Sequence, residues 1–357
     1  MKLRSIAATA LLCIASSTHA DEKILGPNNY IAILTESKLT YKMLSTPSAH
    51  PVKTFECPPR TERMRVVKTA NGERALDQWN VKLEALKIAN EGETLYQAGD
   101  FDGAAAKYRE AIAADPDFVS AYFFLGDALL FGAKDANAAL EQYRKGVALD
   151  PTLHTGYLFS STALVQLGQI AGAREQMVQA LLNNPKYESG WKVLQNAQRL
   201  QIKPVVRFKF NAPEGIVGVA SKDGIDIYGG KDAEWLGYAM CKAVWANEPQ
   251  FAKKHAPDSW SIEEERACVL NQMQAAYNAT DAKLKKKNPR ASEEQVIAAL
   301  PPLERHLIDV AQAKLLDGYI LFEIIGQHCP LGTSMLDDAS REQIAQYLRK
   351  FVIVAAN

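Results

Sequence analysis

Residues 96–118 read YQAGDFDGAAAKYREAIAADPDF, and this stretch contains the pattern that decides the fold. A Gly-Asp break comes first, then an alanine-rich stretch with helical spacing, then an abrupt stop. The stop is physical, because a proline ring disfavours helical geometry in the residue before it. The stop in this stretch is Asp115-Pro116, and it recurs twice more along the chain, at Asp150-Pro151 and Asn184-Pro185, with proline spacings of 35 and 34 residues.

Small and large residues also recur at fixed distances from each proline. Two helices pack closely only where Gly, Ala or Ser stands at the contact, with larger side chains filling the gaps between contacts. The small positions are Gly92, Gly126 and Ser161, then Ala104, Ala138 or Ala139, and Ala173, then Ala111, Gly146 and Ala180. The large positions are Leu95, Leu129 and Leu164, then Tyr108, Tyr143 and Met177.

This pattern resembles the tetratricopeptide repeat (TPR), a helix–turn–helix unit of about 34 residues. The resemblance covers about residues 85–187, and the segment 189–202 is typical of the helix that caps such an array. Two departures from the family pattern stand out. The first unit has Ile88 and Glu91 where the family prefers a large aromatic residue and a Leu, and the second has an extra residue near FGAKDAN (131–137). We interpret both as local variation.

The resemblance implies that the first helix of each unit lines a concave groove that holds a peptide or a partner protein. A TPR subfamily that grips C-terminal carboxylates has Lys, Asn and Arg at places that hold Ala89, Glu93, Phe124, Thr155 and Phe159 here, so that clamp is absent. We expect an apolar, aromatic groove with two acidic points. The predicted groove residues are Ala89, Glu93, Tyr96, Gln97, Phe123, Phe124, Asp127, Phe131, Leu158, Phe159, Thr162 and Gln166. Three occupants stay open: a polypeptide partner, the chain's own flanking segments, or a second copy in a homo-oligomer.

The first twenty residues predict an exported protein. They have a basic start, an apolar stretch and a small-residue end, which favours a signal peptide cleaved after Ala20 and a periplasmic location. Cys13 would allow a lipid anchor, but Leu12 stands before it where a small residue is expected. Lys+Arg and Asp+Glu both number 41, which gives no electrostatic reason to expect a nucleic-acid partner. No later run approaches the about 18 apolar residues of a membrane helix.

Four cysteines remain after the leader, and an even number in an exported protein favours disulfides. Three pairings are possible. Cys241 and Cys268 fall on consecutive predicted helices, which an antiparallel hairpin would bring together. We therefore favour a Cys241–Cys268 bond, with Cys57 left for Cys329.

Periodicity along the chain predicts a mainly α fold: a TPR-type array, a small antiparallel β-meander and a C-terminal helical bundle. The predicted divisions are the signal peptide (1–20), a mixed strand and loop region (21–84), the array (85–202), the meander (203–231) and the helical domain (232–357). Within the flanks we expect strands at 30–34, 38–44 and 63–67, meander strands at 205–210, 215–220 and 224–228, and helices at 232–254, 261–287, 292–300, 302–328 and 340–356.

The sequence contains no catalytic motif that survives inspection, and it predicts neither a metal nor a cofactor. Glu304 and His306 are two residues apart and do not share a helix face. His328-Cys329 could bind a metal with Cys57, although a disulfide explains Cys329 better. Glu323 lies in an apolar run, where it is either at the wet edge of a helix or a buried site candidate. The set Trp235, Tyr238 and Trp245 is interpreted as core.

The predicted function is therefore a non-enzymatic, periplasmic scaffold or adaptor that binds a polypeptide partner. The alternative is an envelope enzyme or small-ligand binder, in which residues 203–357 form the active module and the array is a docking arm.

Overall fold

The computed structural model describes residues 26–48, 64–213, 215–217, 224–231, 235–252 and 261–356. The predicted signal peptide, Cys13 and Cys57 lie outside these ranges. The fold is mainly α and divides into two compact units, each built from two separate stretches of chain. The repeat unit combines Cys57–Arg207 with Ile325–Asn357, and the second unit combines Met1–Glu56 with Phe208–Ile324.

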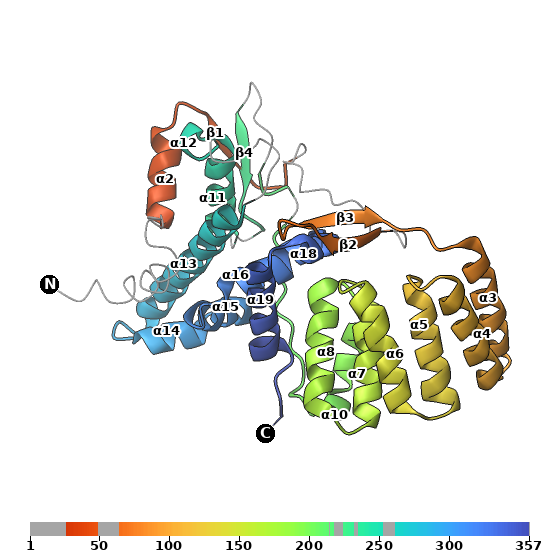
Figure 1. The fold of residues 1–357 in the computed structure, drawn as a ribbon. Helices are drawn as coiled ribbons and strands as arrows, with labels where there is room; N and C mark the ends of the chain where they lie inside the picture. Colours follow the sequence, from red (N-terminus) through yellow and green to blue (C-terminus); the bar gives the residue numbers. More distant parts are fainter. Residues whose placement is uncertain are drawn as a thin grey trace. The chain divides into compact units, whose positions relative to one another are not determined.

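The repeat unit contains three consecutive helical hairpins (Figure 1). Within each hairpin the two helices pack on one another, and the second helix of one hairpin packs on the first helix of the next. A further helix, α9, follows the third hairpin, as the capping segment predicts. The helices are α3 (Leu83–Gln97) and α4 (Phe101–Ala114), α5 (Val119–Asp127) and α6 (Ala136–Leu149), α7 (His154–Gln166) and α8 (Ile170–Asn183), then α9 (Glu188–Gln195) and the short α10 (Ala197–Leu200).

Aspartates lie at both ends of the second helices of the first two hairpins. The side chains of Asp100 and Asp135 accept hydrogen bonds from the backbone N–H groups of Gly103 and Ala138, which satisfies free donors at the starts of α4 and α6. At the other ends, the Asp115 and Asp150 residues that precede the prolines have left helical geometry. The breaks read from residues 96–118 are confirmed.

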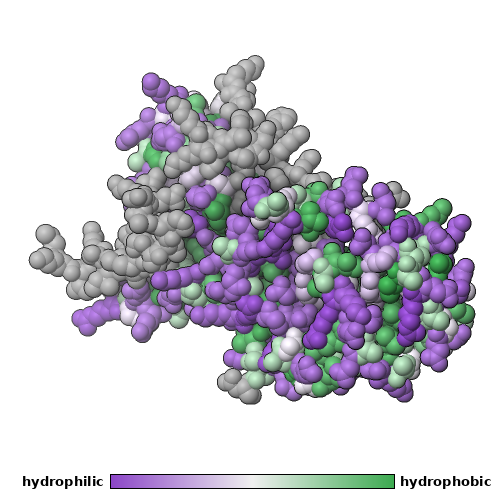
Figure 2. Space-filling view, viewed as in Figure 1, coloured by the Kyte–Doolittle hydropathy of each residue, from purple (hydrophilic) through white to green (hydrophobic). Residues whose placement is uncertain are grey.

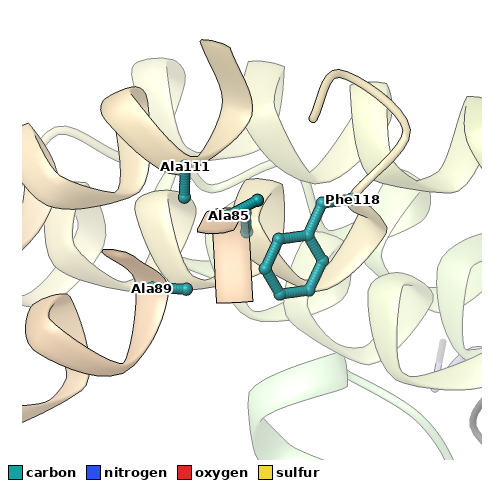
Figure 3. Packing of buried hydrophobic residues seen from close by; sticks show 5 residues of the cluster. Ala85, Ala89, Ala111 and Phe118 are labelled. Atoms are coloured by element: carbon teal, nitrogen blue, oxygen red, sulfur yellow. The ribbon is translucent and has the colours of Figure 1, made fainter. Parts of the chain in front are cut away.

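The small residues are contact points between helices, as predicted. A Cβ added to Gly92 would lie 2.6 Å from Cε1 of Tyr108, and one added to Gly126 would lie 2.2 Å from Cε1 of Tyr143. At the first hairpin of the array, four buried alanines and one phenylalanine ring form a cluster, which Figure 3 shows. Its members are Ala85, Ala89, Ala111, Ala121 and Phe118.

The extra residue of the second repeat is absorbed without disturbing the stack. Helix α5 passes into a π-helical turn, η1 (Ala128–Gly132), whose hydrogen bonds join residues five apart instead of four and so accommodate one extra residue. Lys134 then takes a left-handed conformation, with φ of 55°, before α6 begins. The longer spacing between the first two prolines is therefore local, as expected.

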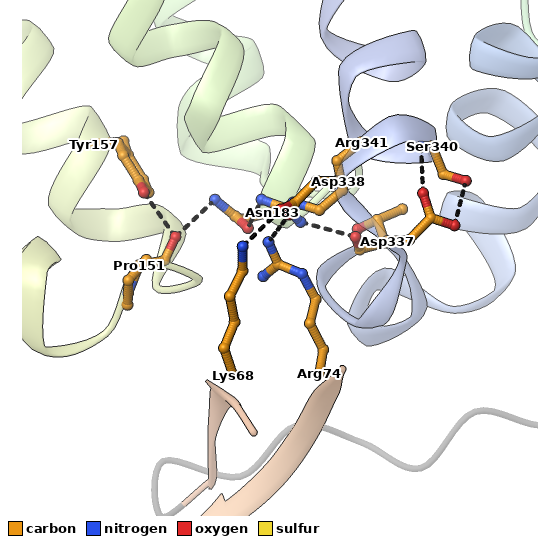
Figure 4. A network of polar contacts seen from close by, with 10 residues as sticks. Lys68, Arg74, Pro151, Tyr157, Asn183, Asp337, Asp338, Ser340 and Arg341 are labelled. Carbon is orange, nitrogen blue, oxygen red and sulfur yellow. Dashed lines mark hydrogen bonds and ion pairs between the residues drawn. The ribbon is translucent and has the colours of Figure 1, made fainter. Parts of the chain in front are cut away.

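The rest of the repeat unit attaches to the third hairpin. An antiparallel hairpin of β2 (Met64–Lys68) and β3 (Arg74–Gln78) joins the C-terminal helices through Lys68 and Arg74, whose side chains both bind Asp338 (Figure 4). The buried guanidinium of Arg341 donates to the Asn183 side chain at the end of α8. These C-terminal elements are α17 (Gly326–His328), α18 (Pro330–Met335), α19 (Asp338–Tyr347) and the π-helical turn η3 (Leu348–Val352).

The second unit pairs a two-stranded parallel sheet with helices. Strand β1 (Tyr41–Leu44) pairs with β4 (Ile225–Tyr228), and a buried carboxylate, Glu248, accepts hydrogen bonds from Ser37 and Tyr41. The helices are α2 (Pro27–Glu36), α11 (Leu236–Asn247), α12 (Pro249–Ala252), α13 (Ile262–Lys287), α14 (Glu293–Ala299), α15 (Pro302–Gln312) and α16 (Leu316–Tyr319), followed by the π-helical turn η2 (Ile320–Ile325).

Three local predictions for the flanks are wrong. Residues 30–34 belong to helix α2, because Pro27 occupies its first turn and Tyr30 is buried with its hydroxyl bonded to Trp245. Residues 205–210 are not a strand, and 225–228 pairs in parallel with distant β1 instead of forming a meander. The antiparallel sheet lies at residues 64–78. The expected helix 302–328 is interrupted at Lys314, which has a left-handed φ of 60°.

The domain boundary predicted at residue 232 is also not the one that the structure has. Residues 325–356 belong with the repeats, and residues 26–48 belong with the second unit. Residues 203–357 are thus no single module.

The favoured disulfide is present between α11 and α13. Cys241 and Cys268 are bonded, with an S–S distance of 2.06 Å. Cys329 is also disulfide-bonded, and its predicted partner, Cys57, lies outside the described residues. A bonded Cys329 offers no thiolate to a metal, which removes the His328-Cys329 metal hypothesis.

Candidate functional site: the first-helix face

The first helices of the three hairpins, α3, α5 and α7, present a shared face. Helix α5 packs directly on α7 as well as on its own hairpin partner, which places the first helices along the inner side of the stack. We call the partly or fully exposed side chains on this side the first-helix face. Its members are Glu93, Tyr96, Gln97, Phe124, Asp127, Phe131, Phe159, Thr162 and Gln166.

Three predicted groove residues are not part of this face. Ala89, Phe123 and Leu158 are 1%, 3% and 9% exposed, respectively. The ring of Phe123 fills the space left by two glycines, because a Cβ on Gly146 or Gly156 would meet it at 2.4 or 2.6 Å. These side chains are core, and a partner cannot reach them. The other predicted groove residues are half-buried or exposed, and Phe131 on the π-helical turn is 50% exposed.

Two carboxylates on this face are held by tyrosines from the second helices. The Tyr108 hydroxyl on α4 donates to Oε1 of Glu93 on α3, and the Tyr143 hydroxyl on α6 donates to Oδ1 of Asp127 at 2.6 Å. Both tyrosine rings are fully buried. Each carboxylate is therefore fixed in direction by a side chain that cannot easily rotate.

A phenylalanine from the following repeat completes each arrangement. Phe124 packs on the Tyr108 ring, with centroids 5.5 Å apart, and Phe159 packs on the Tyr143 ring at 5.6 Å. The result is two equivalent acid–tyrosine–phenylalanine units, one repeat apart. The first unit is Glu93, Tyr108 and Phe124, and the second is Asp127, Tyr143 and Phe159.

The third repeat does not continue this chemistry. Thr162 stands at the position of Asp127, and its hydroxyl bonds the Leu158 carbonyl of its own helix. Met177, fully buried, stands at the position of Tyr143. The first-helix face is consequently acidic over two repeats and uncharged over the third.

The surroundings of Asp127 make its carboxylate costly to keep ionised. Burial raises the pKa of Asp127 to about 6; the Tyr143 hydrogen bond opposes that shift, and the charge of Glu93 adds to it. The pKa values of the tyrosines beside these acids are raised as well. Burial raises the pKa of Tyr96, and the neighbouring carboxylates of Asp127 and Glu93 raise it further. The two acids thus share one partly buried, negatively charged environment.

Within the repeat unit as described, no flanking element covers the first-helix face. The elements that pack substantially on α3, α5 and α7 are all repeat helices or the π-helical turn, whereas α18 and α19 pack on α8. In the view of Figure 2, hydrophobic side chains over the repeats lie between hydrophilic ones. The first-helix face itself combines half-buried aromatic rings with two carboxylates, a mixture that fits contact with another polypeptide better than a role as hidden core.

A buried polar cluster between α11 and α13 of the second unit is paired within itself. Lys242 on α11 forms ion pairs with Glu264 and Glu265 on α13, and the Tyr238 hydroxyl donates to Glu265 at 2.7 Å. Burial alone would lower the pKa of Lys242, but the two carboxylates outweigh it and raise that pKa. Together with the neighbouring Cys241–Cys268 bond, this network ties α11 to α13.

The remaining candidates for chemistry are buried. The His306 ring stacks on Phe208, with centroids 4.3 Å apart, and burial lowers its pKa to about 4. Glu323 is 2% exposed, so it does not lie at a wet helix edge. Tyr238 and Trp245 are core, as predicted. In the described ranges, no group of three His, Cys, Asp or Glu side chains could hold a metal, and no helix is long and apolar enough to cross a membrane.

The comparisons with known proteins agree with the repeat pattern. A family model described as tetratricopeptide repeat matches residues 90–154, from α3 to the start of α7. The chain carries tetratricopeptide repeats. No curated protein matches it.

Solved TPR structures resemble part of the chain. They include the first TPR domain of human RPAP3 (21% identity, TM-score 0.31, covering 32% of this chain and 91% of that one). The TPR2B domain of yeast Sti1, solved as a complex with pHsp70, has 21% identity and a TM-score of 0.31, covering 33% and 94%. The Yersinia enterocolitica type III secretion chaperone SycD, in complex with a peptide of the translocator YopD, has 15% identity and a TM-score of 0.31, covering 34% and 92%.

Sequence reasoning placed Tyr108 and Tyr143 only as large residues that fill gaps, and it missed their hydrogen bonds to the groove acids. The sequence does contain a signal for these two hydrogen bonds. An acid is followed by a tyrosine 15 or 16 residues later in the first two TPRs, and both the acid and the tyrosine are replaced in the third.

Proposed function

We propose that the protein is a non-enzymatic, exported adaptor whose first-helix face binds a segment of another polypeptide. The observation that carries this proposal is the row of half-buried aromatic side chains on α3, α5 and α7, which no described flanking element of the repeat unit covers. Stacked helices hold these rings in place, so binding costs little ordering of the receptor. The leader pattern supports a periplasmic location.

The rival function, an enzyme built on residues 203–357, lacks comparable support. Those residues divide between two compact units, and the polar cluster on α11 and α13 is paired within itself.

Site-specific photo-crosslinking in the native cell envelope tests the proposal. A photoreactive phenylalanine analogue is placed at Gln97 or Gln166, which are exposed at the ends of α3 and α7. Matched control positions are Glu110 and Glu141, which are exposed on the second helices. We expect discrete adducts with another protein from the first pair only, and their loss when Phe124→Glu is added. Equal adducts from both pairs, or adducts that survive Phe124→Glu, would refute a groove-based role.

A further inference from the structure

The two acid–tyrosine–phenylalanine units have a feature that a purely apolar groove does not require. Their carboxylates form no ion pair in the described part of the chain. The nearby Lys107 is used elsewhere, since it binds Glu91 at 2.9 Å and Glu110 at 3.2 Å on the outer side of the first hairpin. Two negative charges on a binding face therefore lack a cation.

The geometry also leaves part of each carboxylate available. The tyrosine hydroxyl bonds one oxygen of Glu93 and one of Asp127, and the described residues bond neither second oxygen. Those second oxygens are not among the buried polar atoms that lack partners, so they face solvent. A ligand can reach them without displacing the tyrosine.

The phenylalanine beside each acid gives the site a second property. Phe124 and Phe159 are half-buried, with part of each side chain on the same face as the acids. A lysine or arginine has a long apolar stem and a charged head, which fits an aromatic surface that ends in a carboxylate. An acidic ligand would meet like charge at both units, and a wholly apolar ligand would bury both charges without compensation.

We infer that the first-helix face recognises a basic, apolar polypeptide segment, with one lysine or arginine of the partner seated at each acid–tyrosine–phenylalanine unit. The third TPR, with Thr162 and Met177 at the equivalent positions, receives an uncharged part of the segment. This inference rests on the proposed function, and it adds the chemistry of the partner.

Fluorescence anisotropy with model peptides tests the inference on the full chain. The probes are short fluorescein-labelled peptides in which leucine alternates with lysine, glutamine or glutamate. We expect the lysine peptide to bind most tightly and the glutamate peptide most weakly. Glu93→Gln and Asp127→Asn should each weaken binding of the lysine peptide about 10- to 150-fold, the range for one hydrogen bond to a charged group, and leave binding of the glutamine peptide unchanged.

Matched variants separate this effect from a loss of structure. Glu91→Gln removes a carboxylate from the same helix, α3, but one that pairs with Lys107, so it should leave lysine-peptide affinity unchanged. Glutamine and asparagine can still accept the tyrosine hydrogen bonds, and circular dichroism should show unchanged helix content.

The outcomes distinguish the inference from the proposed function. If the three peptides bind equally, and Phe124→Glu abolishes all three, the face is a docking site but the charge preference is wrong. Lysine-peptide affinity that Glu93→Gln and Asp127→Asn leave intact would also overturn the inference. If none of the three peptides binds, both the inference and the docking role fail.

Discussion

Replacing Gly126 with alanine tests the packing rule that shapes the repeat unit. The added Cβ would lie 2.2 Å from Cε1 and 2.6 Å from Cδ1 of Tyr143, whereas unbonded carbons sit about 3.5–4.0 Å apart. Tyr143 cannot move aside freely, because its ring is buried against Phe159 and its hydroxyl is bonded to Asp127. The substitution must therefore displace the ring or separate α5 from α6.

The expected change in the free energy of unfolding combines two costs and one gain. Overpacking a close helix contact costs about 1–3 kcal/mol. Displacing Tyr143 from the Asp127 carboxylate costs about another 1.5 kcal/mol. Against these, alanine in place of glycine within a helix gains up to about 1 kcal/mol. We expect Gly126→Ala to lower the free energy of unfolding of the repeat unit by about 1.5–3.5 kcal/mol.

The control is Gly172→Ala in α8, where the nearest atom to the new Cβ is Leu164 Cδ1 at 3.5 Å, an ordinary contact. Only the helix-propensity gain applies there, so this variant should be neutral or up to about 1 kcal/mol more stable. Urea unfolding followed by circular dichroism measures both variants, and hydrogen exchange over α5 and α6 localises the change. If Gly126→Ala is as stable as Gly172→Ala, the close contact does not constrain the stack and the reasoning is wrong.

Three further predictions concern charge and covalent links. Because the folded state raises the pKa of Asp127 from 3.8 to about 6, the unfolded chain ionises first, and stability is lost as pH rises from about 4 to 6 and stays lost above 6. Asp127→Asn should therefore recover up to about 3 kcal/mol at pH 7, but almost nothing below pH 4, as measured by urea unfolding. Arg341→Ala should lower the free energy of unfolding by about 2–4 kcal/mol, because buried acceptors lose their donor. Arg349→Ala, which removes the exposed ion pair with Glu175, should lower it by less than about 1 kcal/mol. The double variant Cys241→Ser with Cys268→Ser should lower the free energy of unfolding by about 3.5 kcal/mol. Reductant should destabilise the original protein through this bond, and that part of the effect should be absent in the double variant.

The TPR stack is the part of the fold that local sequence predicts well. Each hairpin contact joins residues close in the chain, such as Tyr108 and Glu93 or Tyr143 and Asp127, which are 15 and 16 residues apart. A small residue, a large residue and a proline at fixed spacing thus define the packing of neighbours without reference to the rest of the molecule. The side chains of Asp100, Ser261 and Ser292 cap helices α4, α13 and α14 through backbone N–H groups three residues later, which is also a local interaction.

The candidate site was only partly predictable, because helix periodicity gives the direction of a side chain but not what lies above it. Phe123 and Phe124 are adjacent and chemically identical. One fills the space over two glycines, and the other is half-buried on the first-helix face. The roles of the two buried tyrosines as carboxylate clamps required the relative placement of α3 with α4 and of α5 with α6.

By itself, the sequence determined a three-repeat helical stack with its stops and caps, since these depend on contacts within about one repeat length. Only the tertiary structure decided how the flanks are divided. Residues 41–44 pair with 225–228, and Lys68 reaches Asp338 across 270 positions of the chain. No periodic pattern marks such pairings, because a strand's unpaired backbone groups accept many partners. The choice among those partners is made by burial and charge in the assembled unit.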